Sequence, residues 1–585
     1  MLGIRSDQRG LFEADHLYRD FVGPDTFYGF LARQRGQLFH DAEFAALYCL
    51  ANGRTSVPPS LLATALLLQT YDRVSDEEAK ERADFDLRWK GALGIALDER
   101  PFAKSTLQVF RAQLIVHEEV RAVFKKSLTF ARQTGYLKQR KIKTALDTSN
   151  ILGRGAVKDT YNLVADGIVK LSRALAGLAG AKPAPWAAAH DLACYFTTSS
   201  LKGEAHIDWG NARARQTLLQ RIVADADRLL AIARQTLCTY DAESVERTNL
   251  TEAAALLGQV LLQDIERTAD GARIKEGVSR DRVVSVHDPE MRHGRKSKVK
   301  RFDGHKAAVA VDPASQLITA VDVLAGNAPD NAQALALVEQ TEENAQVEVE
   351  ETIGDCAFGD GTTRQAFADA GRTLVAKVPD RPNTGQIPKE DFQIDLETQT
   401  CTCPAGTACQ TLAPLGRRRD RTGASQKLLG FTFDPAVCAA CARRTECVKA
   451  GPGKGRTVSL HPQEALLQEA RAFQRSDAFA PYRGVRQSAE HRLARLMQLG
   501  MRQARYVGRV KTLYQVLMAA TVANLTLVAA QVGLTRSRGS RRSHSFAPLA
   551  DAVVVFISAF ALSVACCLSL TGQNSARRTR FRPGF

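Results

Sequence analysis

One short stretch of the chain reads Val347-Glu348-Val349-Glu350-Glu351-Thr352-Ile353-Gly354-Asp355. Apolar side chains at Val347, Val349 and Ile353, followed by a glycine, are typical of a strand that ends at an exposed position. Such a strand would present the carboxylate of Asp355 at its end. An aspartate that only forms the turn after the strand is the alternative interpretation of this stretch taken alone.

A similar pattern occurs earlier, at Thr144-Ala145-Leu146-Asp147-Thr148-Ser149. A short apolar segment again leads to an aspartate, and glycines follow at 153 and 155. The pattern predicts a second strand that ends at a carboxylate, Asp147, with a cap or turn former as the alternative. After Asp355 we expect a helix at 362–370 and another strand at 373–378.

The segment 288–306 opens with Asp288-Pro289-Glu290 and is then densely basic, with Asp303 as the one acid in 292–306. This density of cations suits contact with a DNA phosphate backbone, and a solvated basic loop is the alternative. Strand-like runs at 307–311 and 317–323 predict a hairpin behind it. The cations expected to contact DNA are Arg292, Arg295, Lys296, Lys298, Lys300 and Lys306.

A third acid, Glu490, lies in a basic helical stretch that begins at Tyr482-Arg483. Arg486 and Glu490 are four residues apart, so on a helix they share a face and can form an ion pair. The pattern leaves two interpretations open. Glu490 is a plain salt-bridge partner, or it is a third metal ligand and the residues Tyr482, Arg483 and Arg486 contact DNA.

Six cysteines cluster between 401 and 447, in the patterns C-x-C-x5-C and C-x2-C-x5-C. Thiolates at such spacing suit a tetrahedral zinc site, although an iron–sulfur cluster or buried thiols would fit the same spacing. Six candidates for four positions leave the ligand set undecided. The candidates are Cys401, Cys403, Cys409, Cys438, Cys441 and Cys447.

Two further regions are predicted to be helical. Residues 1–137 contain an apolar helix at 61–69 and two capping-box patterns, at 75–78 and 105–108. After the second box, an apolar face leaves Arg111 pointing elsewhere, as in a helix that lies on DNA or in an ordinary surface helix. Residues 158–267 read as a helical insertion, with an apolar face that includes Tyr161 and Leu175 and a proline-containing loop at 182–187.

The 585-residue chain carries a formal net charge of +16, which favours a polyanionic partner such as nucleic acid over a surplus that only aids solubility. The N-terminus has mixed charges and no long apolar run, so no secretory signal is expected. We therefore expect a cytoplasmic, nucleoid-associated protein whose cysteines are reduced.

Taken together, the stretches around Asp147, 288–306, Gly354-Asp355 and Glu490 resemble the DDE transposases of bacterial insertion sequences. The resemblance covers most of residues 10–530. It implies an α/β fold. An RNase H-like mixed-sheet catalytic core (138–535) would follow a helical N-terminal DNA-binding domain (1–137). Within the core it implies a helical insertion (about 156–270) and a Cys-rich insertion (about 398–455).

The resemblance also implies chemistry. Asp147, Asp355 and Glu490 match the three catalytic acids, which would hold two Mg²⁺ ions, or Mn²⁺. The enzyme would cut DNA at the terminal inverted repeats of its element and join the 3′ ends to target DNA, working as a homo-oligomer. Related transposases show Y-x2-R-x3-E-x6-K around the third acid. Here Tyr482 lies one residue early, and Met497 stands where the final lysine would be.

The tail, 536–585, fits this family less well. Residues 552–570 carry no charge and are flanked by arginines, which meets the length of a membrane span as well as that of a buried helix. Two rivals to an active transposase therefore stay open: a DNA-binding protein with an inactive core, and a membrane-attached protein.

Overall fold

The computed structural model describes residues 1–5, 18–49, 53–197, 199–240, 243–277, 279–297, 299–379, 386–419 and 425–540. The chain forms two compact units, Met1–Ala529 and Ala530–Phe585. All elements below lie in the first unit, apart from the end of α21. The apolar run predicted at 552–570 lies outside the described residues.

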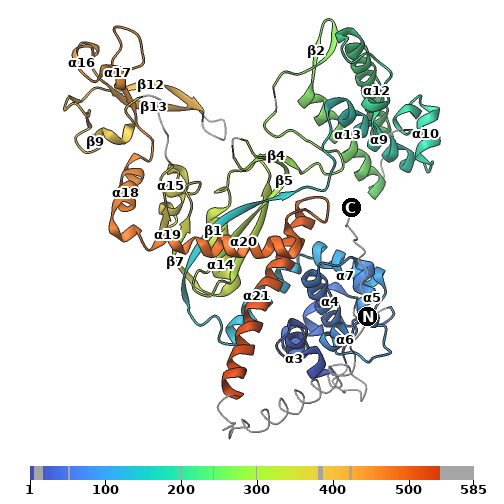
Figure 1. Cartoon of the computed structure of the whole chain (residues 1–585). Coiled ribbons are helices and arrows are strands. Elements are labelled where there is room, and N and C mark those ends of the chain that lie inside the picture. The colour runs from blue at the N-terminus through green and yellow to red at the C-terminus, as the bar shows by residue number, and fades with distance from the viewer. Residues whose placement is uncertain are drawn as a thin grey trace, which may run out of the picture. The chain divides into compact units, whose positions relative to one another are not determined.

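A six-stranded mixed sheet forms the centre of the first unit (Figure 1). Its path runs β4-β5-β1-β7-β8, with β6 also paired to β5. β1 is antiparallel to β5 and parallel to β7, and β7 is parallel to β8. The strands are β1 (Lys141–Leu152), β4 (Arg292–Arg295), β5 (Arg301–Val311), β6 (Ile318–Ala325), β7 (Glu348–Gly354) and β8 (Leu374–Ala376).

This sheet confirms the predicted α/β class, and its strand order is consistent with an RNase H-like core. The predicted hairpin is formed by β5 and β6, and the predicted helix and strand after Asp355 are α15 (Gly361–Asp369) and β8. α15 and α14 (Ala334–Ala345) cover one side of the sheet. Their Leu337 and Phe367 pack with Leu146 of β1 in a fully buried cluster.

Two later helices complete the core. α20 (Gln487–Leu496) packs against β1 and β5. It is followed by a π-helical turn (Met497–Met501) and by α21 (Arg509–Ser540). The buried Asn524 of α21 pairs with the backbone of Ile318 at the start of β6, accepting from its N–H at 2.9 Å and donating to its C=O at 2.8 Å. Asn524 therefore fixes α21 to the sheet edge.

α21 also contains a segment, Arg509–Gln531, that is long and apolar enough to cross a membrane, with a mean hydropathy of 1.6. Two thirds of its most apolar window (67%) is buried inside the protein. Burial of this kind is what a core helix requires, so its hydropathy has a structural cause.

The predicted helical N-terminal region is confirmed, and its helix at 61–69 lies within α4. Ser75 caps α5 by accepting from the N–H of Glu78, which confirms one of the two contacts of the predicted capping box, while the carboxylate of Glu78 pairs with Arg82. The second predicted capping box is wrong, because α7 begins at Lys104 after an uncapped Ala103. The elements are α2 (Arg19–Val22), α3 (Phe27–Leu38), a 3₁₀ helix (Asp41–Leu47), α4 (Pro59–Asp72), α5 (Asp76–Phe85), α6 (Leu87–Leu93), α7 (Lys104–Val116) and α8 (Val120–Gln133).

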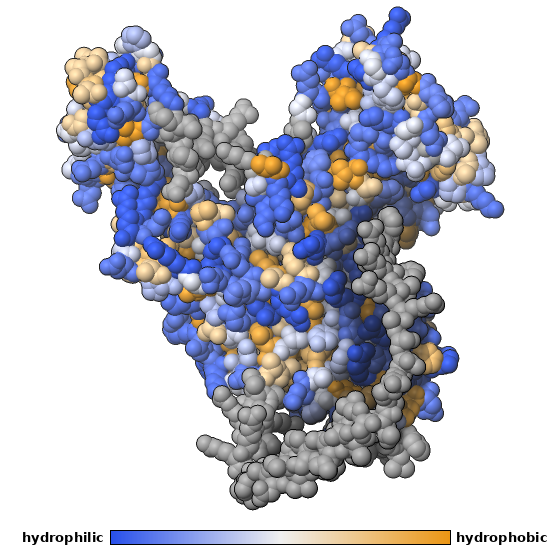
Figure 2. Space-filling view, in the orientation of Figure 1, coloured by the Kyte–Doolittle hydropathy of each residue, from blue (hydrophilic) through white to orange (hydrophobic). Residues whose placement is uncertain are grey.

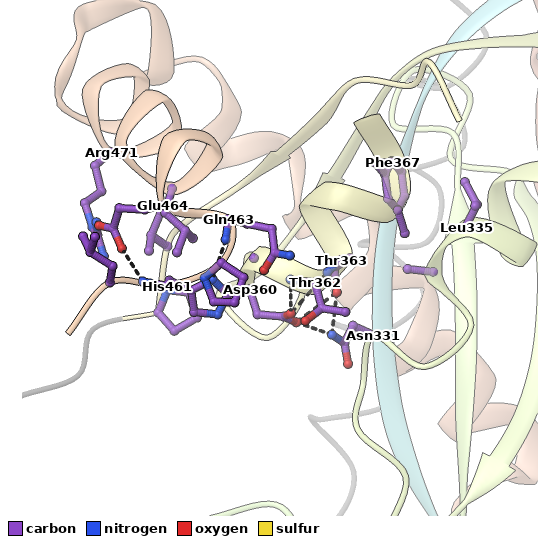
Figure 3. Close-up of a pocket in the computed structure, with 18 of the residues that line it drawn as sticks. Asn331, Leu335, Asp360, Thr362, Thr363, Phe367, His461, Gln463, Glu464 and Arg471 are labelled. Carbon is purple, nitrogen blue, oxygen red and sulfur yellow. Dashed lines mark hydrogen bonds and ion pairs between the residues drawn. The ribbon is translucent and has the colours of Figure 1, made fainter. Parts of the chain in front are cut away.

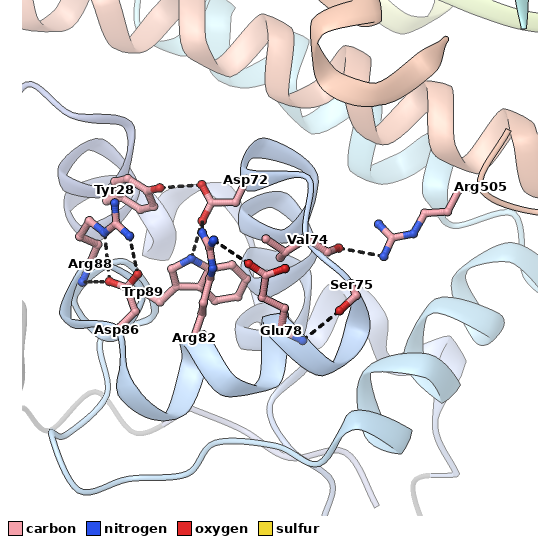
Figure 4. A network of polar contacts seen from close by, with 10 residues as sticks. All are labelled: Tyr28, Asp72, Val74, Ser75, Glu78, Arg82, Asp86, Arg88, Trp89 and Arg505. Carbon is pink, nitrogen blue, oxygen red and sulfur yellow. Dashed lines mark hydrogen bonds and ion pairs between the residues drawn. The ribbon is translucent and has the colours of Figure 1, made fainter. Parts of the chain in front are cut away.

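A polar network inside this helical region is drawn in Figure 4. Asp72, at the end of α4, accepts from Tyr28 at 2.6 Å, from Arg82 at 2.6 Å and from the indole of Trp89 at 2.7 Å. Arg505, from the segment between α20 and α21, donates to the C=O of Val74 at 2.8 Å. The contacts of Asp72 thus hold α3, α4, α5 and α6 together, and the contact of Arg505 joins this helical region to the core.

The helical insertion is also confirmed. Its predicted apolar face, from Tyr161 to Leu175 of α9, is buried in a cluster with α12 and α13. The loop predicted at 182–187 is wrong: it forms α10, because a proline at the first helical position needs no N–H partner there. The elements are α9 (Thr160–Leu178), α10 (Pro183–Ala189), a 3₁₀ turn (Ala193–Tyr195), α11 (Leu201–Glu204), α12 (Ala212–Thr239), α13 (Val245–Asp264), β2 (Ile265–Thr268) and β3 (Gly271–Ile274).

The Cys-rich insertion consists of two small sheets and short helices, joined back to the core by α18. Its sheets have the orders β11-β10-β9 and β12-β13-β14. The elements are a 3₁₀ turn (Lys389–Asp391), β9 (Gln393–Asp395), β10 (Thr400–Thr402), β11 (Ala408–Cys409), β12 (Leu412–Arg419), β13 (Ser425–Thr432), α16 (Pro435–Ala440), α17 (Arg444–Cys447), β14 (Thr457–Ser459), α18 (Glu464–Arg475), a 3₁₀ turn (Asp477–Phe479) and α19 (Tyr482–Val485).

The face of the molecule in Figure 2 is mostly hydrophilic, with apolar residues scattered over it. Large exposed apolar side chains such as Phe85, Val245 and Val299 belong to different parts of the chain. Scattered exposure of this kind is ordinary for a globular surface.

Candidate active site

The sheet brings Asp147 and Asp355 to the same edge. The last paired residues of the parallel strands β1 and β7 are Ala145 and Ile353, and each aspartate lies two residues further on. Since parallel strands run in the same direction, equal offsets from a register pair place the two carboxylates at neighbouring strand ends. The structure thus brings together two of the three predicted acids.

Asp147 is partly buried, and its pKa is raised to about 6. Burial is the largest cause, and the negative charges of Asp355 and Glu490 add to it. Two contacts oppose the rise: the N–H of Thr148, which donates to Oδ1 at 2.8 Å, and the positive charge of Arg486. The three acids and Arg486 therefore share one electrostatic environment.

Asp355 ends β7 at a tight turn. Its Oδ1 accepts from the N–H of Ala357 at 2.8 Å, and its C=O accepts from the N–H of Phe358 at 3.1 Å. A Cβ at Gly354 would lie 2.7 Å from the Cβ of the buried Phe358, so only glycine lets the chain turn this closely. The turn-forming interpretation of Asp355 is correct, and it leaves Oδ2 free for another role in the part of the chain described.

Glu490 approaches from α20. The helix buries Ala489, Leu493 and Leu496 and leaves Glu490 exposed. Nη2 of Arg486 lies 2.6 Å from Oε1 of Glu490, so the predicted ion pair is present. Because the field of Glu490 also reaches Asp147, the salt bridge does not exclude a place in the acid cluster.

The donor set suits a hard divalent cation, because carboxylate oxygens are the ligands that Mg²⁺ and Mn²⁺ prefer. Neighbouring carboxylates repel one another, and a cation between them would remove that repulsion. Within the described residues, no group of three or more His, Cys, Asp or Glu side chains is close enough to hold a metal ion as it stands. To bind the cation, Glu490 would have to break its ion pair with Arg486.

Tyr482 has a structural place beside the site. Its hydroxyl donates to Oε2 of Glu351 at 2.9 Å, and its ring packs on Phe473 and Phe479. The ammonium of Lys143 lies 5.0 Å from the ring centroid. Tyr482 therefore packs against the aromatic cluster and Glu351. Arg483, by contrast, is exposed.

The basic segment forms the hairpin of β4 and β5. Arg295, Lys296 and Lys300 are exposed around its tip, as predicted for cations that meet DNA, and Lys298 lies outside the described residues. Arg292 is partly buried, and its guanidinium donates to the C=O groups of Pro289 and Met291.

Lys306 departs from the expected set of DNA-contacting cations. Its side chain is 12% exposed, and Nζ lies 2.8 Å from Oδ1 of Asp330 and 2.7 Å from the C=O of Ala328. Adjacent positions on a strand face opposite sides of the sheet, so a basic run cannot all face solvent. The ammonium of Lys306 serves the loop after β6.

Arg111 does not point outward as the sequence suggested. It is 7% exposed and pairs with Asp76 of α5, Nη2 to Oδ1 at 2.5 Å, while its guanidinium lies 5.7 Å from the ring centroid of Tyr506. α7 is therefore packed through this arginine. The amphipathic pattern could not show this, because both partners come from other parts of the chain.

The sequence left the role of Asp288-Pro289-Glu290 undefined beyond its resemblance. Asp288 and His305 are fully buried, with Oδ2 and Nε2 3.5 Å apart. Glu290 accepts from the backbone N–H of Arg509 at 2.7 Å and pairs with its Nε at 3.0 Å. The three-residue motif therefore joins β5 to the start of α21, next to the end of β1.

A cavity in the described part of the chain lies away from these acids. It has a volume of about 970 Å³ and lies between α14, α15 and the segment around His461 (Figure 3). Asp360 caps α15 there and accepts from Asn331, which also donates to Thr363 at 2.6 Å. None of Asp147, Asp355 and Glu490 lines it.

The six clustered cysteines separate into two groups. Cys403, Cys438, Cys441 and Cys447 line one small cavity of the Cys-rich insertion. Cys401 and Cys409 are instead buried opposite each other on β10 and β11.

Two comparisons place the chain among known proteins. Residues 402–529 match the family described as Transposase DDE domain. Residues 17–113 match the family described as Transposase domain (DUF772). The first match contains Glu490 and most of the Cys-rich insertion but neither Asp147 nor Asp355, and the second covers most of the helical N-terminal region. No curated protein and no solved structure matches the chain.

Proposed function

Since the chain is a DNA transposase of the DDE type found in insertion sequences, we propose that Asp147, Asp355 and Glu490 are its catalytic acids. The observation that carries the proposal is their convergence. Two of the acids end neighbouring parallel strands, and the charge of the third reaches Asp147 from the facing helix. The charges of Asp355 and Glu490 raise the pKa of Asp147, which costs stability and so indicates a functional site.

The acids would hold Mg²⁺ or Mn²⁺, two ions in the proposed mechanism. Bound there, the ions would activate the attacking oxygen and stabilise the leaving one. The chain's own contribution is to hold the carboxylates at two strand ends and one helix. Thr148 and Ala357 fix one oxygen of each aspartate through their N–H groups, leaving the second oxygen to face the ligand.

The DNA substrate would be the terminal inverted repeats of the element, followed by target DNA. The exposed cations Arg295, Lys296 and Lys300 at the tip of the β4–β5 hairpin support phosphate contact, together with Arg483 of α19. An element has two ends, so joining both to one target calls for at least two copies of the chain acting together. We propose that this takes place in the cytoplasm, at the nucleoid.

The proposal is tested by cleavage of DNA that carries the element's ends, with Mg²⁺ added or withheld. Asp147→Asn, Asp355→Asn and Glu490→Gln should each abolish metal-dependent cleavage and leave DNA binding largely intact. Glu350→Gln is the control, because Glu350 is an exposed acid on the same strand as Asp355. Unchanged cleavage in any of the three variants removes that residue from the site.

A DNA-binding protein with an inactive core is the second candidate. It is favoured by the Arg486–Glu490 ion pair and by the absence, in the described residues, of an assembled three-ligand metal site. The same assay separates the two. Specific binding to the element's ends without cleavage by the unaltered protein would support the inactive core.

A further inference from the structure

The Cys-rich insertion provides two environments for its cysteines. Cys401 and Cys409 are buried and opposite each other in the register of β10 and β11. Sγ of Cys409 donates to the C=O of Thr432 at 3.2 Å. These two cysteines therefore belong to the packed interior.

The other four cysteines meet at one place. Cys403, Cys438, Cys441 and Cys447 line a cavity of about 40 Å³, and each is partly exposed. Cys403 lies in the turn after β10, and the remaining three lie on or beside α16 and α17. We propose that these four thiolates form a structural zinc site, with Cys401 and Cys409 outside the ligand set.

The local backbone is shaped as such a site requires. At Cys403 the chain folds back on itself: its N–H donates to the C=O of Thr407 at 2.9 Å, and its C=O accepts from the N–H of Gly406 at 2.8 Å. On the other side, the N–H of Arg456 donates to Sγ of Cys438 at 3.5 Å. A backbone N–H directed at sulfur stabilises the thiolate form, as the outer contacts of a metal site do.

The charge around the cavity is complementary. Zinc with four thiolates carries two net negative charges, and Arg443, Arg444 and Arg456 line the same cavity. The guanidinium of Arg456 is buried and donates to the C=O of Cys447 at 2.8 Å and of Ile387 at 2.9 Å. Three cations lining this cavity would offset the negative charge of the bound cluster.

The insertion also needs a cross-link. Among the described residues, its buried core consists of seven, two of which are the packed cysteines, and the described cysteines are free rather than disulfide-bonded. A module with so small a core usually depends on a metal or a disulfide for stability. A zinc ion joining the turn after β10 to α16 and α17 would supply that link.

Zinc binding requires the sulfur atoms of the four cysteines to move closer together. In the part of the chain described, no three ligand side chains lie near enough to one another to hold an ion as they stand. Rotation of cysteine χ1 between staggered positions moves Sγ without moving the backbone, so partly exposed thiols around one small cavity can converge. Zinc should therefore make the insertion more rigid as well as bind to it.

Zinc content of the purified, reduced full-length protein tests the proposal. We expect one zinc per chain by elemental analysis. Alanine at Cys403, Cys438, Cys441 or Cys447 should weaken zinc binding by more than about 100-fold, because changes to outer contacts alone cost about 10- to 100-fold. Cys409→Ala is the matched control, since it removes a neighbouring thiol of the same insertion and should keep full zinc content.

A ligand variant could lose zinc merely by unfolding, so a second measurement uses Co²⁺ in place of zinc. The unaltered protein should show the intense visible bands of tetrahedral Co²⁺ bound to four thiolates. Cys447→His keeps a ligand, and its bands should shift to those of three thiolates and one imidazole. Bound iron instead of zinc, loss of zinc in Cys409→Ala, or unshifted bands in Cys447→His would each overturn the assignment.

Discussion

Nη2 of Arg486 lies 2.6 Å from Oε1 of Glu490, one helical turn away, while the positive charge of the same arginine lowers the pKa of Asp147. Arg486 therefore acts on two of the three acids at once. It forms an ion pair with Glu490 on the helix, and it partly offsets the repulsion that Asp147 on the strand experiences from the other two acids.

Replacing Arg486 by glutamine should shift the pH dependence of cleavage. Without the arginine, the pKa of Asp147 rises further above 6, because burial and the other two acids then act unopposed. The acidic limb of the rate profile should move to higher pH by about one unit or less, since the arginine is partly exposed. Arg483→Gln, an exposed arginine of α19, is the control. An equal loss of rate at every pH would assign Arg486 to DNA contact alone.

Asp147→Asn should stabilise the protein while it abolishes cleavage. The carboxyl has a pKa of about 6 in the folded chain and 3.8 as the reference value. Below pH 4 both states are protonated. Between 4 and 6 only the folded chain keeps the proton, so the free energy of unfolding falls as pH rises, by about 3 kcal/mol in all. Asparagine carries no charge and escapes this loss.

Melting temperatures in EDTA, compared at about pH 4 and at about pH 7.5, test this. The advantage of Asp147→Asn should be present at the higher pH and absent at the lower. Asp322→Asn is the matched control, because it removes the charge of a carboxylate on β6 whose Oδ1 also accepts from the next N–H, at 2.8 Å, and asparagine can keep that contact. An equal advantage at both pH values would show that its cause is not ionisation.

The strands and helices around the acids could be predicted because each depends on a local pattern. Apolar alternation ending in glycine and aspartate located the ends of β1 and β7, and a four-residue spacing located the Arg486–Glu490 pair. What the sequence could not show was pairing across long separations. The register of Ala145 with Ile353, which makes the two aspartates neighbours, joins residues about 200 positions apart.

The two errors that concern charged side chains share one physical cause, since each depended on a partner from another element. Arg111 was taken for an outward residue, but Asp76 draws it inside. Lys306 was counted with the exposed cations, but Asp330 holds it. A sequence pattern gives the face of a helix or strand, whereas burial of a charge depends on whether an opposite charge arrives from elsewhere.

Mg²⁺ should raise the melting temperature of the unaltered protein, because an ion that binds only the folded chain stabilises it by mass action. The gain is about 2.7 kcal/mol when the ion is at 100 times its dissociation constant. Asp355→Asn and Glu490→Gln should lose most of this gain, and Glu350→Gln should keep it. A gain that survives in both triad variants would place the metal elsewhere.

Two lysines of the basic segment should have different roles, one in DNA binding and the other in stability. Lys300→Ala removes an exposed cation and should lower the slope of log affinity for DNA against log salt by about one. Lys306→Ala should leave that slope unchanged and instead reduce stability by about 1–2 kcal/mol, because it breaks the contact with Asp330. Salt titrations of DNA binding and urea unfolding of both variants measure this. A reduced slope in Lys306→Ala would restore it to the DNA-contacting set.

Asn524 should prove the most sensitive polar residue of α21. Leucine there fills the same space but leaves the N–H and C=O of Ile318, both buried, without partners. Each unsatisfied group costs about 1–3 kcal/mol, so the expected loss in the free energy of unfolding is about 2–5 kcal/mol. Thr526→Ala, on the partly exposed side of the same helix, should cost less than about 0.5 kcal/mol.

Asn524 also holds the strand β6 that pairs with β5, and β5 in turn pairs with β1 at Asp147. Cleavage should therefore fall in proportion to unfolding in Asn524→Leu. Full stability with lost cleavage would instead indicate a direct part in the reaction.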